Sequence, residues 1–206
     1  MVEAAEYNSD VNFKFHNGSP MRLQGDSMSD EEFYSFCIKN HELRIERAPN
    51  GQIIIVPPTT SETGRRNFEI SMEIGLWNRQ HKLGHVFDSS TGFKLPNGAE
   101  RSPDTSWILK ERWEALAPED QQKFAPIVPD FVLELRSQDQ SLHELHEKMA
   151  EYMDCGSRLG WLIDPQNRRT YVYSENGDIQ TIKFEGHLSG YEVMPELKIR
   201  LTDILG

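Results

Sequence analysis

The sequence predicts an α/β (α+β) fold with a mixed central sheet, flanking helices and β-hairpins. The first supporting observation is the strand–helix–strand order across residues 131–163, which is typical of a parallel crossover. The second is the Asn-Gly pair, which recurs at 50–51, 97–98 and 176–177 and favours tight turns between short strands. The third is Ser29, placed three positions before Glu32, a pattern that starts helices.

The length and composition suit one folded domain. At 206 residues and 37% hydrophobic content, the chain can bury a sizeable core. Residues 1–27 are polar and show no periodicity. We therefore expect an N-terminal extension over residues 1–27 and a single domain over residues 28–206.

The first half of the chain should begin with a helix from Ser29 to about Asn40. A long helix is expected from Glu62 to about Gln80. Phe68, Met72 and Leu76 are expected to form its buried face, with Ile70, Ile74 and Trp77 as further candidates. Before the long helix, we expect a hairpin of 43–46 and 52–56. After it, we expect a strand from Gly84, a run at 93–95 with a turn at 96–98, a strand at 105–109 and a helical stretch at 111–124.

The second half contains two further apolar segments. Residues 131–137 and 159–163 should be buried strands, joined by a helix at 141–154 that Gly156 ends. A hairpin of 170–173 and 179–184 follows, and residues 191–205 are expected to be strand-like.

The formal net charge of −11 argues against a protein that coats DNA tightly and without specificity. It does not exclude phosphate binding, because a bound cation can invert the local field. No apolar run approaches the ~20 residues of a membrane span, and the first residues show no secretion signal. Two cysteines, Cys37 and Cys155, are too few for a disulfide framework, so we expect a cytoplasmic protein with reduced thiols.

Asp104, Glu134 and Lys148 are the candidate catalytic residues. Asp104 leads into a predicted strand, Glu134 lies inside a buried one, and Lys148 follows on a helix. Magnesium or manganese takes hard oxygen ligands, and two carboxylates with water suffice. The backbone carbonyl of Leu135 could add a third oxygen. Such a cation assists phosphodiester cleavage by neutralising charge and acidifying water.

Strand alternation places Asp130, Val132, Glu134 and Arg136 on one face of the 131–137 strand. A buried carboxylate needs a partner or a metal, and Arg136 is the simpler partner for Glu134. On the 141–154 helix, Lys148 lies on the flank of the apolar stripe, from which it can reach the sheet. A surface lysine is the alternative interpretation.

These residues resemble the PD-(D/E)xK restriction-endonuclease-like superfamily and, more closely, the Uma-two family of endonucleases. The resemblance covers about Ser29 to Leu205 and rests on several stretches together. They are Arg44-Ile45-Glu46, Glu62-Thr63-Gly64-Arg65-Arg66-Asn67, Phe87-Asp88-Ser89-Ser90-Thr91-Gly92-Phe93, Ser102-Pro103-Asp104, the 129–137 strand, Lys148-Met149-x-Glu151-Tyr152 and Gly160-Trp161-Leu162-Ile163-Asp164-Pro165.

The resemblance implies a metal-dependent nuclease acting on nucleic acid, with Asp104 and Glu134 at the two acidic positions. The superfamily lysine would stand where this chain has Arg136, so the resemblance assigns its role to Lys148. It also implies an acid from the preceding helix, for which Glu69 is preferred over Glu73 and Glu62.

Two alternatives remain open at this point. The domain could keep the nuclease fold without turnover and serve as a binding or assembly module, which the negative charge and the displaced lysine favour. A histidine-based zinc site would need His81 with His85, or His143 with His146, and neither pair has a third ligand. Exposed hairpins and sheet edges permit a homodimer.

Overall fold

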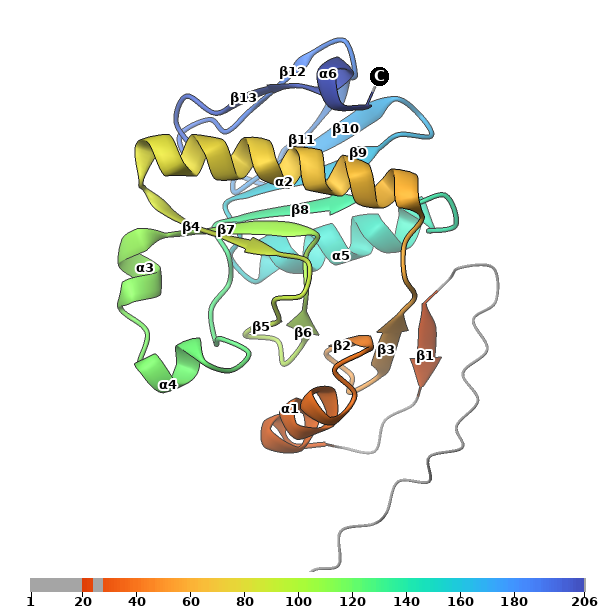
Figure 1. Ribbon diagram of the computed structural model, residues 1–206, viewed down its shortest axis with the longest axis vertical. Helices are drawn as coiled ribbons and strands as arrows, with labels where there is room; N and C mark the ends of the chain where they lie inside the picture. Colours follow the sequence, from red (N-terminus) through yellow and green to blue (C-terminus); the bar gives the residue numbers. More distant parts are fainter. Residues whose placement is uncertain (1–19, 24–27, 206) are drawn as a thin grey trace, which may run out of the picture.

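The structure is a computed structural model that describes residues 20–23 and 28–205 (Figure 1). Its largest layer is a six-stranded mixed sheet, ordered β11-β10-β9-β8-β7-β4. Only the β8–β9 pair is parallel within this sheet, so the predicted crossover is confirmed. The strands are β4 (Gly84–Asp88), β7 (Thr105–Leu109), β8 (Phe131–Leu135), β9 (Leu159–Asp164), β10 (Arg169–Ser174) and β11 (Ile179–Lys183).

A second, five-stranded antiparallel sheet has the order β1-β3-β2-β6-β5. Helix α1 (Asp30–Lys39) begins at the predicted capping box, in which Ser29 and Glu32 satisfy each other's backbone N–H groups. Residues 1–19 and 24–27 of the expected extension lie outside the described residues, whereas its Met21–Leu23 segment is a strand paired with β3. The strands are β1 (Met21–Leu23), β2 (Arg44–Arg47), β3 (Ile53–Val56), β5 (Phe93–Lys94) and β6 (Glu100–Arg101).

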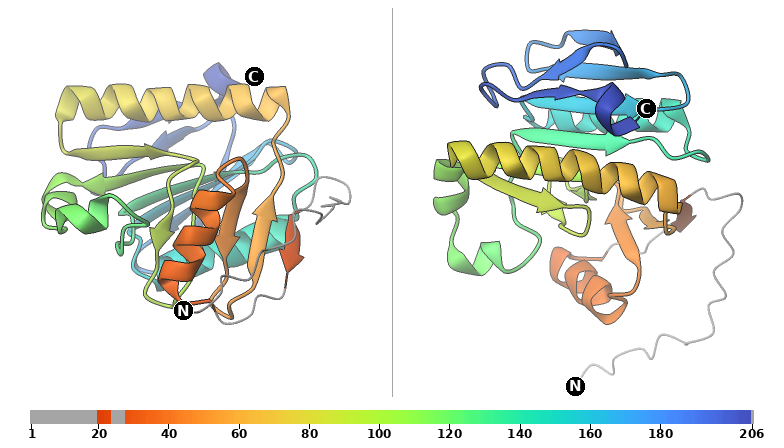
Figure 2. Two further views of the ribbon diagram at one scale, coloured as in Figure 1. Left: turned by 60° about the horizontal axis from the view of Figure 1, so that its bottom comes forward. Right: turned by 45° about the horizontal axis from the view of Figure 1, so that its top comes forward.

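Two helices cover opposite faces of the six-stranded sheet (Figure 2). Helix α2 (Ser61–His81) packs on the face that carries Phe131, Leu133 and Leu135. Helix α5 (Leu142–Asp154) packs on the other face, over Val132. The alternation predicted for β8 is therefore correct, and Glu134 points to the α5 side.

The predicted buried face of α2 is wrong. Ile70, Ile74 and Trp77 face the sheet, whereas Phe68, Met72 and Leu76 are 67%, 39% and 50% exposed. Both sets recur at helical spacing, so periodicity alone could not choose between them. Side-chain shape separates the two sets, because the buried one combines β-branched residues with a tryptophan whose indole N–H donates to the carbonyl of Pro195.

Two further expectations differ from the structure. The 111–124 stretch is two short helices, α3 (Lys110–Glu114) and α4 (Pro118–Gln121), because Pro118 has no N–H to continue a helix and starts a new one instead. The 191–205 segment contains β13 (Lys198–Arg200), paired with β12 (His187–Ser189), and then helix α6 (Leu201–Leu205). Leu201, Ile204 and Leu205 are spaced as a helix face and join the core beside α2.

Candidate functional site

The chain passes from one sheet to the other immediately before Asp104. Strand β6 belongs to the five-stranded sheet and β7 to the six-stranded sheet, and Ser102-Pro103-Asp104 connects them. The β7–β8 ladder begins at Thr105 opposite Leu133. Asp104 therefore stands at the edge where the two sheets meet.

The Asp104 carboxylate is fixed on both of its oxygens. Its Oδ2 accepts the backbone N–H of Leu135 at 2.9 Å. This side-chain bond stands where the next backbone hydrogen bond of the β7–β8 ladder would otherwise form. Its Oδ1 accepts from the guanidinium of Arg44 at 3.1 Å. Because the N–H and C=O of one strand residue point to the same edge, the Leu135 carbonyl also faces the Asp104 side of β8.

Glu134 is buried beside Asp104. Its Oε1 lies 2.8 Å from Nζ of Lys148 and accepts the Tyr152 hydroxyl at 3.3 Å. Burial raises the pKa of the Glu134 carboxyl to about 7; Lys148 opposes this shift and the Asp104 charge adds to it. The carboxylate therefore sits where a positive charge would be favoured.

Lys148 bridges two acids. Its Nζ lies 2.9 Å from Oε1 of Glu46, in addition to its contact with Glu134. Burial alone would lower the pKa of Lys148, but Glu134 and Glu46 raise it. Burial would likewise raise the pKa of Glu46, but Lys148, Arg101 and Arg44 hold it at about 2. Lys148 is thus an ammonium, and it is held between β8 and β2.

Together these side chains form what we call the cleft network: Arg44, Glu46, Arg101, Asp104, Glu134, Lys148 and Glu151. Arg101 completes it by pairing with Glu46 at 3.2 Å and with Glu151 at 2.5 Å. All seven line one cleft of about 210 Å³ between the five-stranded sheet, β8 and α5. The structure therefore brings Asp104, Glu134 and Lys148, which are far apart in the sequence, to one place.

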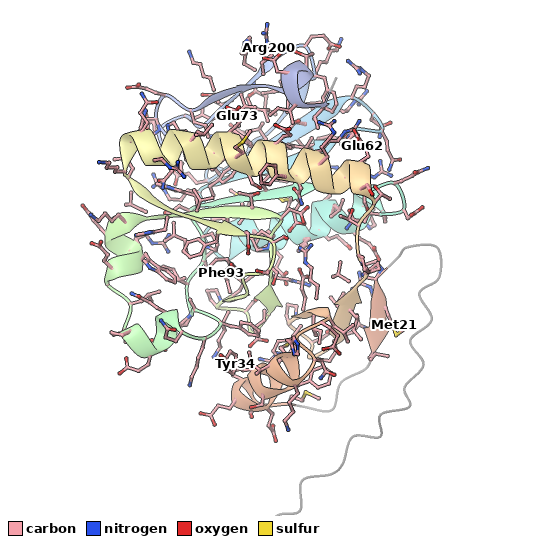
Figure 3. All side chains as sticks on the ribbon, viewed as in Figure 1. Met21, Tyr34, Glu62, Glu73, Phe93 and Arg200 are labelled. Atoms are coloured by element: carbon pink, nitrogen blue, oxygen red, sulfur yellow. The ribbon has the colours of Figure 1, made fainter. Side chains whose placement is uncertain are left out.

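Other predicted residues lie elsewhere. Glu69, Glu73 and Glu62 are on α2, across the sheet from α5, and none of them lines the cleft (Figure 3). Arg136 pairs with Asp164 at 3.2 Å rather than with Glu134. Among the described residues, no group of three or more His, Cys, Asp and Glu side chains is arranged to hold a metal ion. A third acid from α2 and a histidine zinc site therefore find no support in this arrangement.

Arg44, Glu46 and Arg101 belong to the site but were not among the site residues predicted from the sequence. Arg44 and Glu46 lie on β2, nearly sixty residues before Asp104. One sequence feature could have pointed to them: three of the four residues of β2 are charged, beside the wholly apolar run of β3. Buried charges in a short strand need partners, which here come from β6 and α5.

The described part of the chain contains no helix long and apolar enough to cross a membrane. No protein of curated function matches the chain. The fold resembles the crystal structure of a "putative nuclease belonging to DUF820" from Anabaena variabilis ATCC 29413, with a TM-score of 0.68 and 20% identity. That match covers 80% of this chain and 90% of the other, and at this identity it shows a shared fold.

The family comparison covers most of the chain. A family model described as "Putative restriction endonuclease" matches residues 30–202, which include every member of the cleft network. The chain belongs to the Uma2 (Uma-two) family.

Proposed function

We propose that this protein is a divalent-metal-dependent endonuclease that hydrolyses phosphodiester bonds in DNA, with Mg²⁺ or Mn²⁺ as the cofactor. The observation that carries the proposal is the convergence of Asp104, Glu134 and Lys148 on one cleft. Family membership and the nuclease-like fold support the same reaction class.

The residues present fit a hard divalent cation. Asp104, immediately before β7, and Glu134, on β8, offer carboxylate oxygens, and the Leu135 carbonyl faces the Asp104 side of β8. Magnesium commonly takes one or two carboxylates and keeps several waters. Glu134 is also buried with a pKa raised to about 7, so a cation would compete there with a proton. When bound, the ion would supply positive charge and acidify water.

The chain's own residues have separable tasks in this proposal. Asp104 holds its position through the Leu135 N–H, which fixes one ligand oxygen relative to β8. Lys148 keeps a proton on Nζ, since two carboxylates stabilise its charge, and it lines the cleft. An ammonium there can orient the attacking water or stabilise charge that develops on the phosphate.

A calorimetric titration with Mn²⁺ or Ca²⁺ tests the metal site, and cleavage of plasmid DNA tests the reaction. We expect wild type to bind the cation, and Asp104→Ala and Glu134→Ala to lose binding. Cleavage should fall on the order of a thousandfold in both variants. Glu73→Ala, an exposed acid on α2 outside the cleft, is the matched control and should change neither measurement.

One observation favours a second function, a nuclease-fold module that binds or assembles without turnover. Arg44 already pairs with Asp104, and Lys148 with Glu134, so both acids have partners without a metal. The net charge of −11 adds to this view. If both alanine variants bind the cation as wild type does, and wild type does not cleave DNA, then only the function as a binding or assembly module remains.

The proposal includes a cytoplasmic location and a homodimer, which would let two sites cut both strands of a duplex. Sedimentation of wild type with and without a short DNA duplex and Ca²⁺ tests the dimer. A monomer under both conditions would remove that part of the proposal and leave the chemistry of the cleft untouched.

A further inference from the structure

Arg44 is the cation of the cleft network that has a buried nitrogen without a hydrogen-bond partner. Its terminal nitrogens donate to Asp104 Oδ1 and to the carbonyl of Ser102. Its Nε is buried without a hydrogen-bond partner. A guanidinium carries five N–H donors, so several of them have no acceptor here. The side chain is 28% exposed and lines the cleft.

Arg44 and a metal ion would compete for the same carboxylate. Asp104 Oδ2 is engaged by the Leu135 N–H, and Oδ1 is engaged by Arg44. A cation that binds Asp104 therefore weakens or replaces the Arg44 contact. Arg44 comes from β2, on the five-stranded sheet, so it can part from Asp104 without disturbing the β7–β8 ladder.

The charge of the cleft network changes sign when a divalent cation enters. With Glu134 ionised, its members are four carboxylates and three cations, so the network then carries one net negative charge. A divalent ion would leave one net positive charge, and a phosphodiester group carries one negative charge. A guanidinium released from Asp104 also needs a new anion, because an unpaired buried charge is unfavourable. Its planar donors match a phosphate well.

We infer that Arg44 is a substrate-phosphate ligand whose guanidinium is bound to Asp104 in the metal-free protein and is released when a divalent cation binds there. This inference rests on the function proposed above. It makes DNA binding and cation binding mutually reinforcing, because the cation both adds charge and frees Arg44.

The first measurement is Mn²⁺ affinity by calorimetry in wild type, Arg44→Gln and Arg22→Gln. Removing the competitor should tighten Mn²⁺ binding about tenfold or more in Arg44→Gln. Arg22 lines the same cleft but pairs with Glu144 at 3.1 Å, so Arg22→Gln removes an equal charge without freeing Asp104. Arg22→Gln should change the Mn²⁺ affinity by about threefold at most.

The second measurement is the affinity for a short DNA duplex, by fluorescence anisotropy, with and without Ca²⁺. Wild type should gain affinity when Ca²⁺ is added, and Arg44→Gln should lose most of that gain, about tenfold. Without Ca²⁺, Arg44→Gln should weaken DNA binding no more than Arg22→Gln does, because Arg44 is then occupied by Asp104. Arg22→Gln should weaken binding equally under both conditions.

Several outcomes would overturn the inference. If wild type binds Mn²⁺ through Asp104 but Arg44→Gln binds it no more tightly than Arg22→Gln, only the role of Arg44 falls. If no variant binds Mn²⁺, the proposed function falls and takes the inference with it. Arg44→Lys guards against misfolding of the glutamine variant: it keeps the charge without the planar fork, and it should also lose most of the Ca²⁺-dependent gain.

Discussion

The two faces of β8 differ in kind although they share five residues of one strand. On the α2 side, Phe131, Leu133 and Leu135 belong to a hydrophobic cluster with Trp107 and Trp161. On the α5 side, Val132 packs on apolar residues, but Glu134, one pleat further, joins the charges of the cleft network. Strand β8 thus separates a hydrophobic layer on the α2 side from a charged layer on the α5 side.

This difference indicates where stability and chemistry are located. The α2 side gains free energy from burial of apolar area, at roughly 25 cal/mol per Å². The α5 side holds buried charges, which are costly to remove from water and add little net stability even when paired. Substitutions on the two faces should therefore affect different measurements.

The largest expected effect on the free energy of unfolding comes from the hydrophobic α2 side of β8. Leu133→Ala should lower the free energy of unfolding by about 2–5 kcal/mol, because it leaves a cavity in a fully buried cluster. Glu134→Gln, the next residue, should change it by much less at pH 7 while abolishing cation binding. Urea unfolding and Mn²⁺ titration of both variants measure the contrast. A glutamine variant as unstable as the alanine variant would contradict it.

Much of this contrast could be predicted from the sequence, because alternation in β8 is a local property. Alternation placed Glu134 and Leu133 on opposite faces of β8, and helical periodicity placed Lys148 on the flank of the apolar stripe of α5. The identity of the parallel pair also followed, since Phe131–Leu135 and Leu159–Asp164 are strand-like segments joined by one helix.

The remaining features depend on contacts between distant segments. Arg44 and Glu46 reach the cleft only because β2 pairs with β6, and a single paired position, Arg47 with Glu100, makes that connection. Nothing local in β2 specifies that neighbour. The exposed apolar stripe of Phe68, Met72 and Leu76 misled the assignment for a similar reason: two stripes on α2 had the same period, and only the sheet selects one.

The charged face should give the protein a specific pH dependence. Glu134 has a pKa of about 7 in the folded protein against an ordinary value of 4.5, so the folded state binds this proton more tightly. The resulting stabilisation is complete below about pH 4.5 and is lost as the pH rises through 7. At most it amounts to about 3 kcal/mol. Glu46, with its pKa lowered to about 2, acts in the opposite direction: its contribution is present above pH 4.5 and is lost in stronger acid.

Urea unfolding of the metal-free protein between pH 5 and 8 tests this dependence. Wild type should lose stability across the range, and Glu134→Gln should flatten the curve. Glu73→Gln, on the exposed side of α2, should leave the curve of wild type unchanged. If the free energy of unfolding falls with pH at the same rate in wild type and Glu134→Gln, other groups, such as histidines, cause the dependence.

The smallest effects concern how closely the α2 layer is packed. At Gly84, where α2 turns into β4, an added Cβ would lie 2.2 Å from the Ile108 carbonyl oxygen. Gly84→Ala should therefore destabilise the protein by about 1–3 kcal/mol. At Gly75, within α2, an added Cβ meets nothing within 4 Å. Gly75→Ala should stabilise the helix by about 0.5–1 kcal/mol. Thermal unfolding compares the two, and equal effects would mean that the α2 layer can shift to accommodate a methyl group.

The bond from the Leu135 N–H to Asp104 has a practical consequence for spectroscopy. This amide is a backbone group whose hydrogen-bond acceptor is a carboxylate at the centre of the cleft. Its proton and nitrogen resonances should therefore respond to whatever Asp104 contacts, whether arginine or cation. In an isotope-labelled sample, one peak from a fully buried strand would follow events in the cleft without any added dye.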